Sequence, residues 1–387
     1  MSLSKIIAED FITRFNKKPS LFFAPGRINL IGEHTDYNEG FAMPAAIDKH
    51  IVFAVAPSGN DRCNIFSKDL EEGVTFSIYD LNPGEVWINY LMGVIDAFQR
   101  RGLPVRGVDC VFAGNIPVGG GMSSSAALCC GFGFALNEVF QLGISRLEIA
   151  KIAQSSEHHF VGAMVGIMDQ YASLFSKKGS VLLLDCKTLT HEHVPFHFPD
   201  HEILLIDTKV KHSIGSTAYN ERREACELGV KILNKRNPAV HSLRDATRVM
   251  LFDHQDELGE DVFVKCLYVV EENLRVQKAA EYLKEGNPKA FGDLMYQTHW
   301  GLSQAYEVSC QELDFLVSLA EEQRSEVIGS RMMGGGFGGC AINLIQKDAI
   351  SAFQEKVRHR YVENFGIEPE FYLVKLEDGV RIMNFKP

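Results

Sequence analysis

The stretch Pro117-Val118-Gly119-Gly120-Gly121-Met122-Ser123-Ser124-Ser125-Ala126-Ala127-Leu128 determines how we interpret the rest of the chain. The alternation of Val108, Cys110 and Phe112 before it predicts a strand, and the apolar run from Ala126 to Leu136 predicts a buried helix. We expect a serine to cap that helix. The glycines would then lie at a helix N-terminus, where unpaired N–H groups and the helix dipole attract phosphate.

Two interpretations of this glycine turn are open. It is either a tight turn before a serine-capped core helix, or a phosphate site in which glycines let the backbone approach a bulky anion and serine hydroxyls reach Mg²⁺. It is not a Walker A loop, because the chain has no Gly-Lys dipeptide. It also lacks the motifs of protein kinases, and its glycines are consecutive rather than spaced as in a dinucleotide fingerprint.

Length and composition indicate a large globular protein. A chain of 387 residues, with 46% hydrophobic and 23% charged residues, is expected to form two domains. The formal net charge of −11 argues against nucleic acid as a partner, and no apolar run is long enough to span a membrane. Nine cysteines without a C-x-x-C pair indicate buried thiols in a reducing compartment, so we expect a cytoplasmic location.

A second stretch, from Pro25 to Asn38, is dense in ionisable side chains. Arg27, Glu33, His34 and Asp36 lie close together in a segment broken by glycines. One interpretation is a polar surface loop with incidental charge pairing. The other is a site where carboxylates and an imidazole bind the hydroxyls of a polyhydroxylated ligand, and the flanking glycines and prolines favour it because they impose a specific backbone shape.

Glu157 falls on the apolar side of a predicted helix. The segment 145–148 reads as a capping box that begins a helix ending near Phe160. Glu157 lies on the same side of that helix as Ile149 and Ala153, and a carboxylate beside apolar side chains needs a cation. The sequence leaves open whether that cation is a basic side chain or a metal ion.

Asp169 stands between Met168 and Tyr171 in another apolar segment. It either caps the helix that follows or serves as a base that accepts a proton from an alcohol. A nearby cation such as Arg27 would hold it ionised, which is the state a base requires.

Other segments complete the expected architecture. Thr217–Arg223 begins a long charged helix, on which Tyr219 could point into a cleft, and residues 243–324 are mostly helical. The histidines between residues 191 and 201 suit a solvent-facing strand and loop better than a metal cluster. Ser67 and Trp87 could face a nucleotide base. The glycines of 331–340 mark a place where the backbone approaches another group closely. We expect strands at 21–24, 51–56, 63–66, 181–184 and 203–206.

Four of these segments together resemble one enzyme family. The segment Pro25–Tyr37 is similar to the signature of galactokinases, and Pro117–Ala127 resembles the phosphate loop of the wider superfamily that also contains homoserine, mevalonate and phosphomevalonate kinases. Gly166–Gln170 and Arg331–Cys340 resemble the remaining shared motifs. The resemblance covers the chain from about residue 20 almost to the C-terminus, and its first segment is the one specific to galactokinases.

The resemblance implies a two-domain α+β fold with mixed and antiparallel sheets, helices, and an active site between domains 1–178 and 179–387. It implies transfer of the γ-phosphoryl of MgATP to the C1 hydroxyl of α-D-galactose, feeding the Leloir pathway, by a monomer. Asp169 would be the base and Arg27 would stabilise the transition state. Gly335 and Gly336 would back the phosphate pocket. The implied sugar ligands are Glu33, His34, Thr35, Asp36, Asp169 and Tyr219. The implied ATP ligands are Ser67, Trp87, Gly119, Gly120, Gly121, Met122, Ser123, Ser124 and Ser125, and Mg²⁺ would be held by Ser125 and Glu157.

Two other functions remain open at the level of sequence. A related kinase would phosphorylate another acceptor, such as N-acetylgalactosamine or another monosaccharide. A non-catalytic sensor would bind galactose and ATP and then a regulator. Proteins of the second kind lack a Ser-Ala pair in the phosphate loop, whereas residues 123–127 are complete here.

Overall fold

A large sheet near the N-terminus carries the phosphate turn and the ionisable stretch. The computed structural model describes residues 2–84, 86–117, 119–210 and 215–384. Its six-stranded sheet has the order β13-β1-β3-β6-β4-β5, in which only β4 and β6 run parallel. The strands are β1 (Ser20–Asn29), β3 (Pro44–Pro57), β4 (Arg62–Ser67), β5 (Glu72–Ser77), β6 (Val108–Gly114) and β13 (Arg381–Met383). The strands predicted at 21–24, 51–56 and 63–66 are confirmed.

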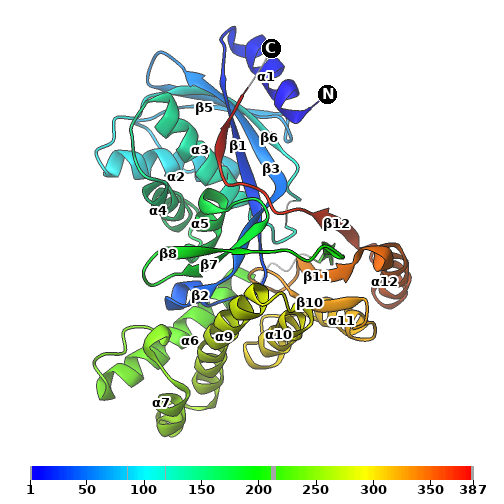
Figure 1. Ribbon diagram of the computed structural model, residues 1–387. Coiled ribbons are helices and arrows are strands. Elements are labelled where there is room, and N and C mark those ends of the chain that lie inside the picture. The colour runs from blue at the N-terminus through cyan, green and yellow to red at the C-terminus, as the bar shows by residue number, and fades with distance from the viewer. Residues whose placement is uncertain (1, 85, 118, 211–214, 385–387) are drawn as a thin grey trace.

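Helices cover both faces of this sheet (Figure 1). The helix α1 (Leu3–Phe15) packs Ile7 and Phe11 against Val52 and Val111 on one face. The other face is covered by the glycine-turn helix and its neighbours, which bury a continuous apolar core with β1 and β3. These helices are α2 (Val86–Arg100), α3 (Ser124–Val139), α4 (Arg146–Ser156) and α5 (Met168–Phe175).

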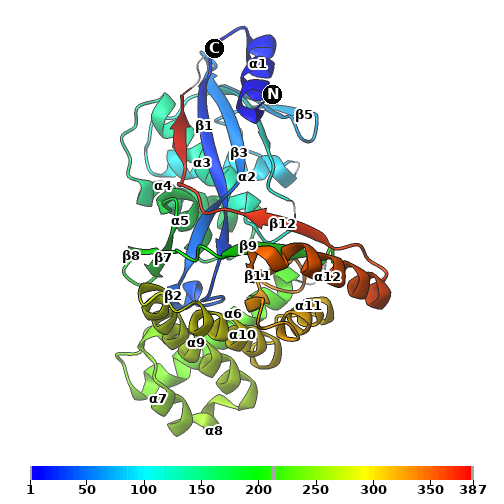
Figure 2. The ribbon, with the colours of Figure 1, turned by 45° about the vertical axis from the view of Figure 1, so that its right-hand side comes forward.

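The C-terminal half forms a second layer of sheet and helices with its own core. Its four strands run antiparallel in the order β10-β11-β9-β12, and most helices of this half lie below them in Figures 1 and 2. The strands are β9 (His201–Asp207), β10 (Val327–Met332), β11 (Cys340–Gln346) and β12 (Glu370–Val374). The helices are α6 (Gly215–Arg236), α7 (Arg248–Asp253), α8 (Gln255–Leu258), α9 (Glu260–Lys284), α10 (Pro288–Trp300), α11 (Gln311–Glu321) and α12 (Ile350–Phe365).

Two features join the halves. A small sheet pairs β2 (Phe41–Ala42) with β7 (Ser180–Asp185), which pairs with β8 (Thr190–Pro195). The chain also returns at its end, where β13 pairs antiparallel with β1. The α+β class is confirmed, and the division between residues 178 and 179 stays a prediction. Short helical turns occupy Asp36–Asn38, Glu157–Val161, Leu243–Asp245, Gly301–Ala305 and Lys347–Ala349.

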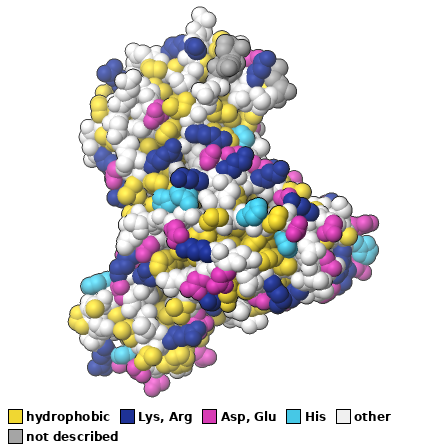
Figure 3. All heavy atoms as spheres, viewed as in Figure 1, with side chains coloured by type: hydrophobic (Ala, Val, Ile, Leu, Met, Phe, Trp, Pro, Cys, Tyr) yellow, Lys and Arg dark blue, Asp and Glu magenta, His cyan; other side chains and the backbone are white. Residues whose placement is uncertain are grey.

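The surface is mixed in character. Acidic and basic side chains alternate over the face in Figure 3, and Lys, Arg and His gather midway along it. Eight of the cysteines are buried and all nine are free, as their apolar surroundings predict. Across the described ranges, no helix combines the length and apolar character needed to cross a membrane.

Candidate active site

The ionisable stretch leaves the end of β1 and is held in place by helix α9. The carboxylate of Glu272, which is fully buried, accepts a hydrogen bond from the Gly32 N–H at 2.8 Å. Asn273 on the next position accepts from the Phe41 N–H at 2.8 Å. Gly32 has a φ of +92°, a conformation open to glycine and strained for other residues. The loop is therefore fixed in shape by contacts from a distant part of the chain.

Glu33 is bound by a buried arginine that the sequence interpretation did not select. The fully buried Arg331 donates to the Glu33 carboxylate at 2.8 Å and to the carbonyls of Leu30, Met332 and Asn29. The N–H of Gly334 donates to the same carboxylate oxygen at 2.8 Å. Burial alone would raise the pKa of Glu33, but Arg331 and then Arg27 hold that pKa below its ordinary value. Glu33 is thus an anion that joins the ionisable loop to the second glycine cluster.

We expect Arg331→Met to lower the free energy of unfolding by about 3–5 kcal/mol, because it leaves the Glu33 charge buried without its partner. Urea unfolding would measure the change. The control is Arg358→Met, which removes an arginine from an exposed ion pair with Glu368 and should cost no more than about 1 kcal/mol. Equal effects of the two substitutions would contradict the importance of the buried pair.

His34 is the start of a buried hydrogen-bonded chain. Its Nδ1 lies 2.8 Å from the Tyr37 hydroxyl, which lies 2.8 Å from the Tyr306 hydroxyl. The Cys226 sulfur lies 3.3 Å from the Tyr306 hydroxyl and extends this series of hydrogen bonds. Burial lowers the pKa of His34 to about 4, so the ring is neutral at pH 7. A neutral imidazole offers one donor and one acceptor, which suits hydroxyl groups.

Asp36 lines the same pocket as Asp169. Its carboxylate accepts from the N–H groups of Tyr37 at 2.9 Å and Met168 at 3.4 Å. Burial, and then the neighbouring charge of Asp169, raises the pKa of Asp36 to about 6. The backbone of Gly166 lies so close that a Cβ there would overlap the Asp36 carboxylate. This glycine is required for close approach and not for an unusual φ.

Arg27 and Asp169 form the centre of the site. The guanidinium donates to both carboxylate oxygens, from Nε and Nη2, at 2.7 Å each. Arg27 also donates from Nη1 to the Gly121 carbonyl, and the Ser123 hydroxyl donates to Asp169. Burial lowers the pKa of Arg27, but Asp169 and Glu33 outweigh it and raise the pKa overall. Segments of sequence far apart therefore meet at one ion pair beside the glycine turn.

The glycine turn differs from the prediction in one respect. Ser123 precedes α3 but has a left-handed backbone, with a φ of 53°, and its side chain caps no helical N–H. Its hydroxyl is directed to Asp169 instead. The serine cap was therefore wrong, and the first turn of α3 keeps its N–H groups free of a capping side chain, as an anion site requires. Gly121 and Gly339 lie against each other's turns, so the two glycine clusters pack together.

Glu157 and Ser125 lie together behind this turn. Glu157 begins a π-helical turn that continues α4, and it accepts from the Gln170 side chain at 2.7 Å and from the Ser125 hydroxyl. Burial, followed by the charge of Asp169, raises the pKa of Glu157 to about 7. In the part of the chain that the structure describes, Glu157 forms no ion pair and no group of three or more His, Cys, Asp or Glu could hold a metal.

These two side chains suit a magnesium ion that has other ligands. Mg²⁺ takes oxygen ligands and commonly uses one or two protein groups together with substrate phosphates and water. A buried carboxylate with a raised pKa is one that lacks a cation, and the hydroxyl beside it supplies a second oxygen. The donor set thus fits the ion, and the adjacent helix N-terminus is where its phosphates would lie.

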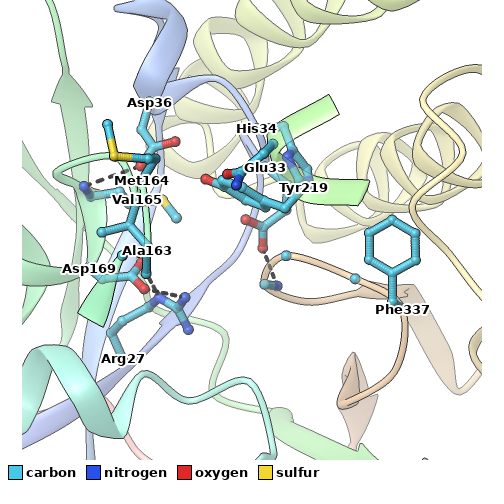
Figure 4. Close-up of a pocket in the computed structure, with 17 residues that line it drawn as sticks. Arg27, Glu33, His34, Asp36, Ala163, Met164, Val165, Asp169, Tyr219 and Phe337 are labelled. Atoms are coloured by element: carbon cyan, nitrogen blue, oxygen red, sulfur yellow. Dashed lines mark hydrogen bonds and ion pairs between the residues drawn. The ribbon is translucent and has the colours of Figure 1, made fainter. Parts of the chain in front are cut away.

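A pocket of about 330 Å³ opens beside these groups. Figure 4 shows Arg27, Asp36, Asp169 and the 163–165 segment on one side and Glu33, His34 and Tyr219 on the other. The Tyr219 ring lies 5.2 Å from that of His34. Gly335 and Gly336 line the pocket too. Glu33 and Asp36 make one part of the pocket acidic, and Arg27 connects the pocket to the glycine turn through the Gly121 carbonyl.

Three predicted site residues lie elsewhere. Thr35 is fully buried and its hydroxyl donates to the carbonyls of Gly32 and Phe41, so it shapes the loop and does not line the pocket. Its assignment as a sugar ligand stays a prediction. Ser67 pairs with Phe112 across β4 and β6, and the Trp87 ring lies 5.7 Å from Phe112. Both residues lie beside Phe112 and outside the pocket, and their contact with a base stays a prediction.

The remaining residues of the glycine turn lie at the N-terminus of α3, where the sequence analysis placed them. Gly119, Gly120, Gly121 and Ser124 surround the start of α3, with φ values of 83° at Gly119 and 71° at Gly121. The Met122 side chain is buried in the core, and only its carbonyl reaches the site, where it accepts from the Arg27 N–H at 3.0 Å.

Comparison with known proteins agrees with this geometry. A galactokinase galactose-binding signature matches residues 9–57, the GHMP kinases N terminal domain matches residues 89–177, and the GHMP kinases C terminal model matches residues 279–363. A galactokinase of Thermosipho africanus is 40% identical over 92% of this chain and 98% of its own length. The chain belongs to the galactokinase family. The match to the signature falls on the ionisable loop, and the N-terminal match spans the glycine turn and Asp169.

Further relatives support the same membership. A galactokinase of Clostridium acetobutylicum is 37% identical over 99% of this chain and 100% of its own length. The crystal structure of Lactococcus lactis galactokinase complexed with galactose superposes with a TM-score of 0.94 at 33% identity, covering 99% of this chain and 100% of the other. Methanococcus jannaschii mevalonate kinase, at 16% identity and a TM-score of 0.65 over 93% of this chain and 99% of its own, shares the fold.

Proposed function

We propose that this protein transfers the γ-phosphoryl group of ATP to the C1 hydroxyl of α-D-galactose, giving galactose 1-phosphate and ADP. The observation that carries the proposal is the bidentate Arg27–Asp169 pair, which Ser123 and Gly121 join to the glycine turn beside a hexose-sized pocket. Membership of the galactokinase family supports galactose as the acceptor.

The residues of the pocket divide the work of sugar binding. Glu33 and Asp36 would accept hydrogen bonds from sugar hydroxyls, while the neutral His34 ring can accept one or donate one. The Tyr219 ring would pack on the sugar. Binding at several hydroxyls fixes the C1 oxygen beside Asp169, and this positioning supplies a large part of the rate enhancement.

The transfer itself requires a base and positive charge. Asp169 would accept the proton of the C1 hydroxyl as that oxygen attacks the γ-phosphorus and the bond to the ADP oxygen breaks. Arg27 and the N–H groups at the start of α3 would stabilise the charge on the migrating group. Ser125 and Glu157 would hold Mg²⁺, which, when bound, neutralises the charge of the phosphates. Ser67 and Trp87 would lie near the adenine.

The acceptor can be tested directly. ADP formation should be fast with galactose and much slower with glucose and N-acetylgalactosamine, measured with a coupled assay under matched conditions. If N-acetylgalactosamine were turned over faster than galactose, it would be the acceptor instead of galactose. Binding of galactose and ATP without ADP release would indicate a sensor instead of an enzyme. We also propose that the protein acts in the cytoplasm, which the free and mostly buried cysteines support. We propose that it acts as a monomer.

The raised pKa of Glu157 predicts a pH-dependent response to Mg²⁺. The pKa lies at about 7 in the fold against an ordinary 4.5, so the protonated form is favoured up to near neutral pH and its contribution to stability is lost as pH rises through that range. Mg²⁺ binds the carboxylate and must displace the proton at lower pH. The increase in melting temperature that Mg²⁺ gives in the presence of ADP should therefore be larger at about pH 8 than at about pH 6.

The matched variant for this experiment is Glu157→Gln, which keeps the shape and removes the titrating group. It should show a small Mg²⁺ effect that does not change with pH. A variant that responds to Mg²⁺ as strongly as the parent protein at both pH values would exclude Glu157 as a metal ligand.

A further inference from the structure

A second cavity, of about 440 Å³, lies apart from the pocket of Asp169. It falls within the size range of small-molecule sites. Segments far apart in sequence line it: Arg146 at the start of α4, Leu174–Lys177 at the end of α5, His191 and His193 on β8, and Asp378–Arg381 leading into β13. On the face shown in Figure 3, Lys, Arg and His side chains gather where β8 and the chain before β13 run in Figure 1.

The walls of this cavity carry an excess of positive charge. Arg146, Lys177 and Arg381 contribute three cationic side chains, and the only carboxylate among the lining residues belongs to Asp378, which accepts from the Lys178 N–H at 3.0 Å. Arg381 also pairs with Glu377 at 3.6 Å and donates to the Asp378 carbonyl at 3.1 Å, which holds its guanidinium beside the cavity. Like charges around one cavity repel one another, and low-dielectric walls strengthen the field between them. A bound anion would remove that repulsion.

Part of the cluster has a structural role. Arg146 donates from Nη1 to the Leu174 carbonyl at 2.7 Å, and His193 donates from Nε2 to the Phe175 carbonyl at 3.0 Å, so both satisfy the end of α5. These bonds leave the other donors of Arg146 available and fix the guanidinium at the cavity wall. Lys177 is exposed, and within the described ranges its side chain forms no hydrogen bond or ion pair, so its charge is free to meet a ligand. Capping of α5 therefore explains Arg146 and His193 but not Lys177.

The histidines respond to the same charges. The Tyr171 hydroxyl lies 2.8 Å from His191 Nδ1, and the rings of His191 and His193 are 4.7 Å apart. Burial lowers the pKa of His191, and the positive charges of His193 and Lys177 lower it further. His191 on β8 and Lys177 after α5 therefore interact electrostatically across the cavity.

The cavity also has an apolar wall. Leu174 and Val380 are buried, and the Phe175 ring stacks on Tyr171 at 4.2 Å. We propose that this cavity binds a phosphate monoester, with the dianionic phosphate at Arg146, Lys177 and Arg381 and the organic group against Phe175, behind which Leu174 and Val380 are buried. Arginine and lysine are the residues that bind phosphate oxygens most strongly, by fork geometry and point charge respectively.

The site is independent of the transfer reaction. Asp169 lies in the first turn of α5 and Leu174 and Phe175 in its last, so the cavity lies at the opposite end of that helix from the base. It can therefore be tested with the active site filled, and the outcome does not depend on the identity of the sugar acceptor.

The test is calorimetric titration of phenyl phosphate into the full chain saturated with galactose and MgADP. We expect saturable binding that Lys177→Gln weakens about tenfold, as loss of one charged hydrogen bond predicts. The matched control is Lys178→Gln, which removes the same charge from the next residue, exposed like Lys177 but outside the cavity, and it should leave affinity unchanged. Circular dichroism would verify that both variants are folded.

Several results would overturn the proposal. Absence of binding in the parent chain would end it, as would equal affinities in the parent chain and the Lys177→Gln variant. An equal loss in the Lys178→Gln variant would show a diffuse surface effect. Titration of inorganic phosphate separates the two sources of the anion: binding as tight as that of phenyl phosphate would show that the site takes the free ion and not a monoester.

Discussion

Asp169→Asn should lower the turnover number by about 10²- to 10⁴-fold while leaving the affinity for ATP near that of the parent protein. The Asp169 carboxylate accepts hydrogen bonds from Nε and Nη2 of Arg27 and from the Ser123 hydroxyl, and these bonds fix its orientation. Asparagine has nearly the same shape but cannot take a proton from the sugar. Its amide also cannot pair with the guanidinium as an anion does. Steady-state kinetics and nucleotide titration would separate the two effects.

The control for this substitution is Ser123→Ala. It removes one hydrogen bond to Asp169 and keeps the carboxylate and Arg27 in place. We expect it to lower turnover much less than Asp169→Asn. If the asparagine variant turned over at close to the parental rate, Asp169 would not be the base, and the proton would have to leave by another route.

Gly166→Ala should reduce kcat/KM for galactose by about 10²-fold, with the change concentrated in KM. A methyl group at this position would overlap the Asp36 carboxylate, which must then move from its place in the pocket. The backbone of Gly166 does not have a positive φ, so the substitution causes no strain of its own. The effect therefore reports the position of Asp36.

Gly84→Ala is the matched control, because it is the same chemical change at a glycine whose added Cβ would meet its nearest neighbour at an ordinary 3.7 Å. It should leave the kinetics unchanged. A Gly166→Ala variant with parental affinity for galactose would show that Asp36 does not contact the sugar.

Much of the fold follows from patterns that are local in sequence. Alternation in 108–112 and the apolar run after Ser125 predicted β6 and α3, and the capping box at 145–148 is present, with the Ser145 side chain accepting from the Glu148 N–H. The break near Gly286 separates α9 from α10 as expected. The π-helical turn at 157–161 was missed, because its extra residue changes no hydrophobic spacing that a reader of sequence can see.

The ionisable residues of the candidate site could be predicted from the sequence, whereas the partner of the Ser123 hydroxyl could not. The pocket is lined by Arg27, Glu33, His34, Asp36, Asp169 and Tyr219. Glu157 was expected to meet a cation; in the fold it accepts from Gln170 and from Ser125, the residue beside which the family resemblance placed it. The cap at Ser123 was wrong because a hydroxyl at a helix start can bond to the helix or to a distant acceptor. Only the fold brings Asp169 within its reach.

The groups that support the site could not be predicted. Arg331 and Glu272 lie about 300 and 240 positions from the loop they hold, and a single arginine or glutamate in a helix or strand carries no local sign of a buried partner. Thr35 was predicted to contact the sugar from its position within the signature, and in the fold its hydroxyl donates to the carbonyls of Gly32 and Phe41. Long-range pairing of this kind is set by topology alone.

The return of β13 to β1 has a consequence for synthesis of the chain. Strand β1 is made long before its partner on one side, which comes from residues 381–383. Until those residues leave the ribosome, one margin of the N-terminal sheet exposes unsatisfied backbone groups of the kind that recruit strands from other molecules. The growing polypeptide is thus open to association at this edge as long as β13 is missing, and cover by a chaperone matters during that interval.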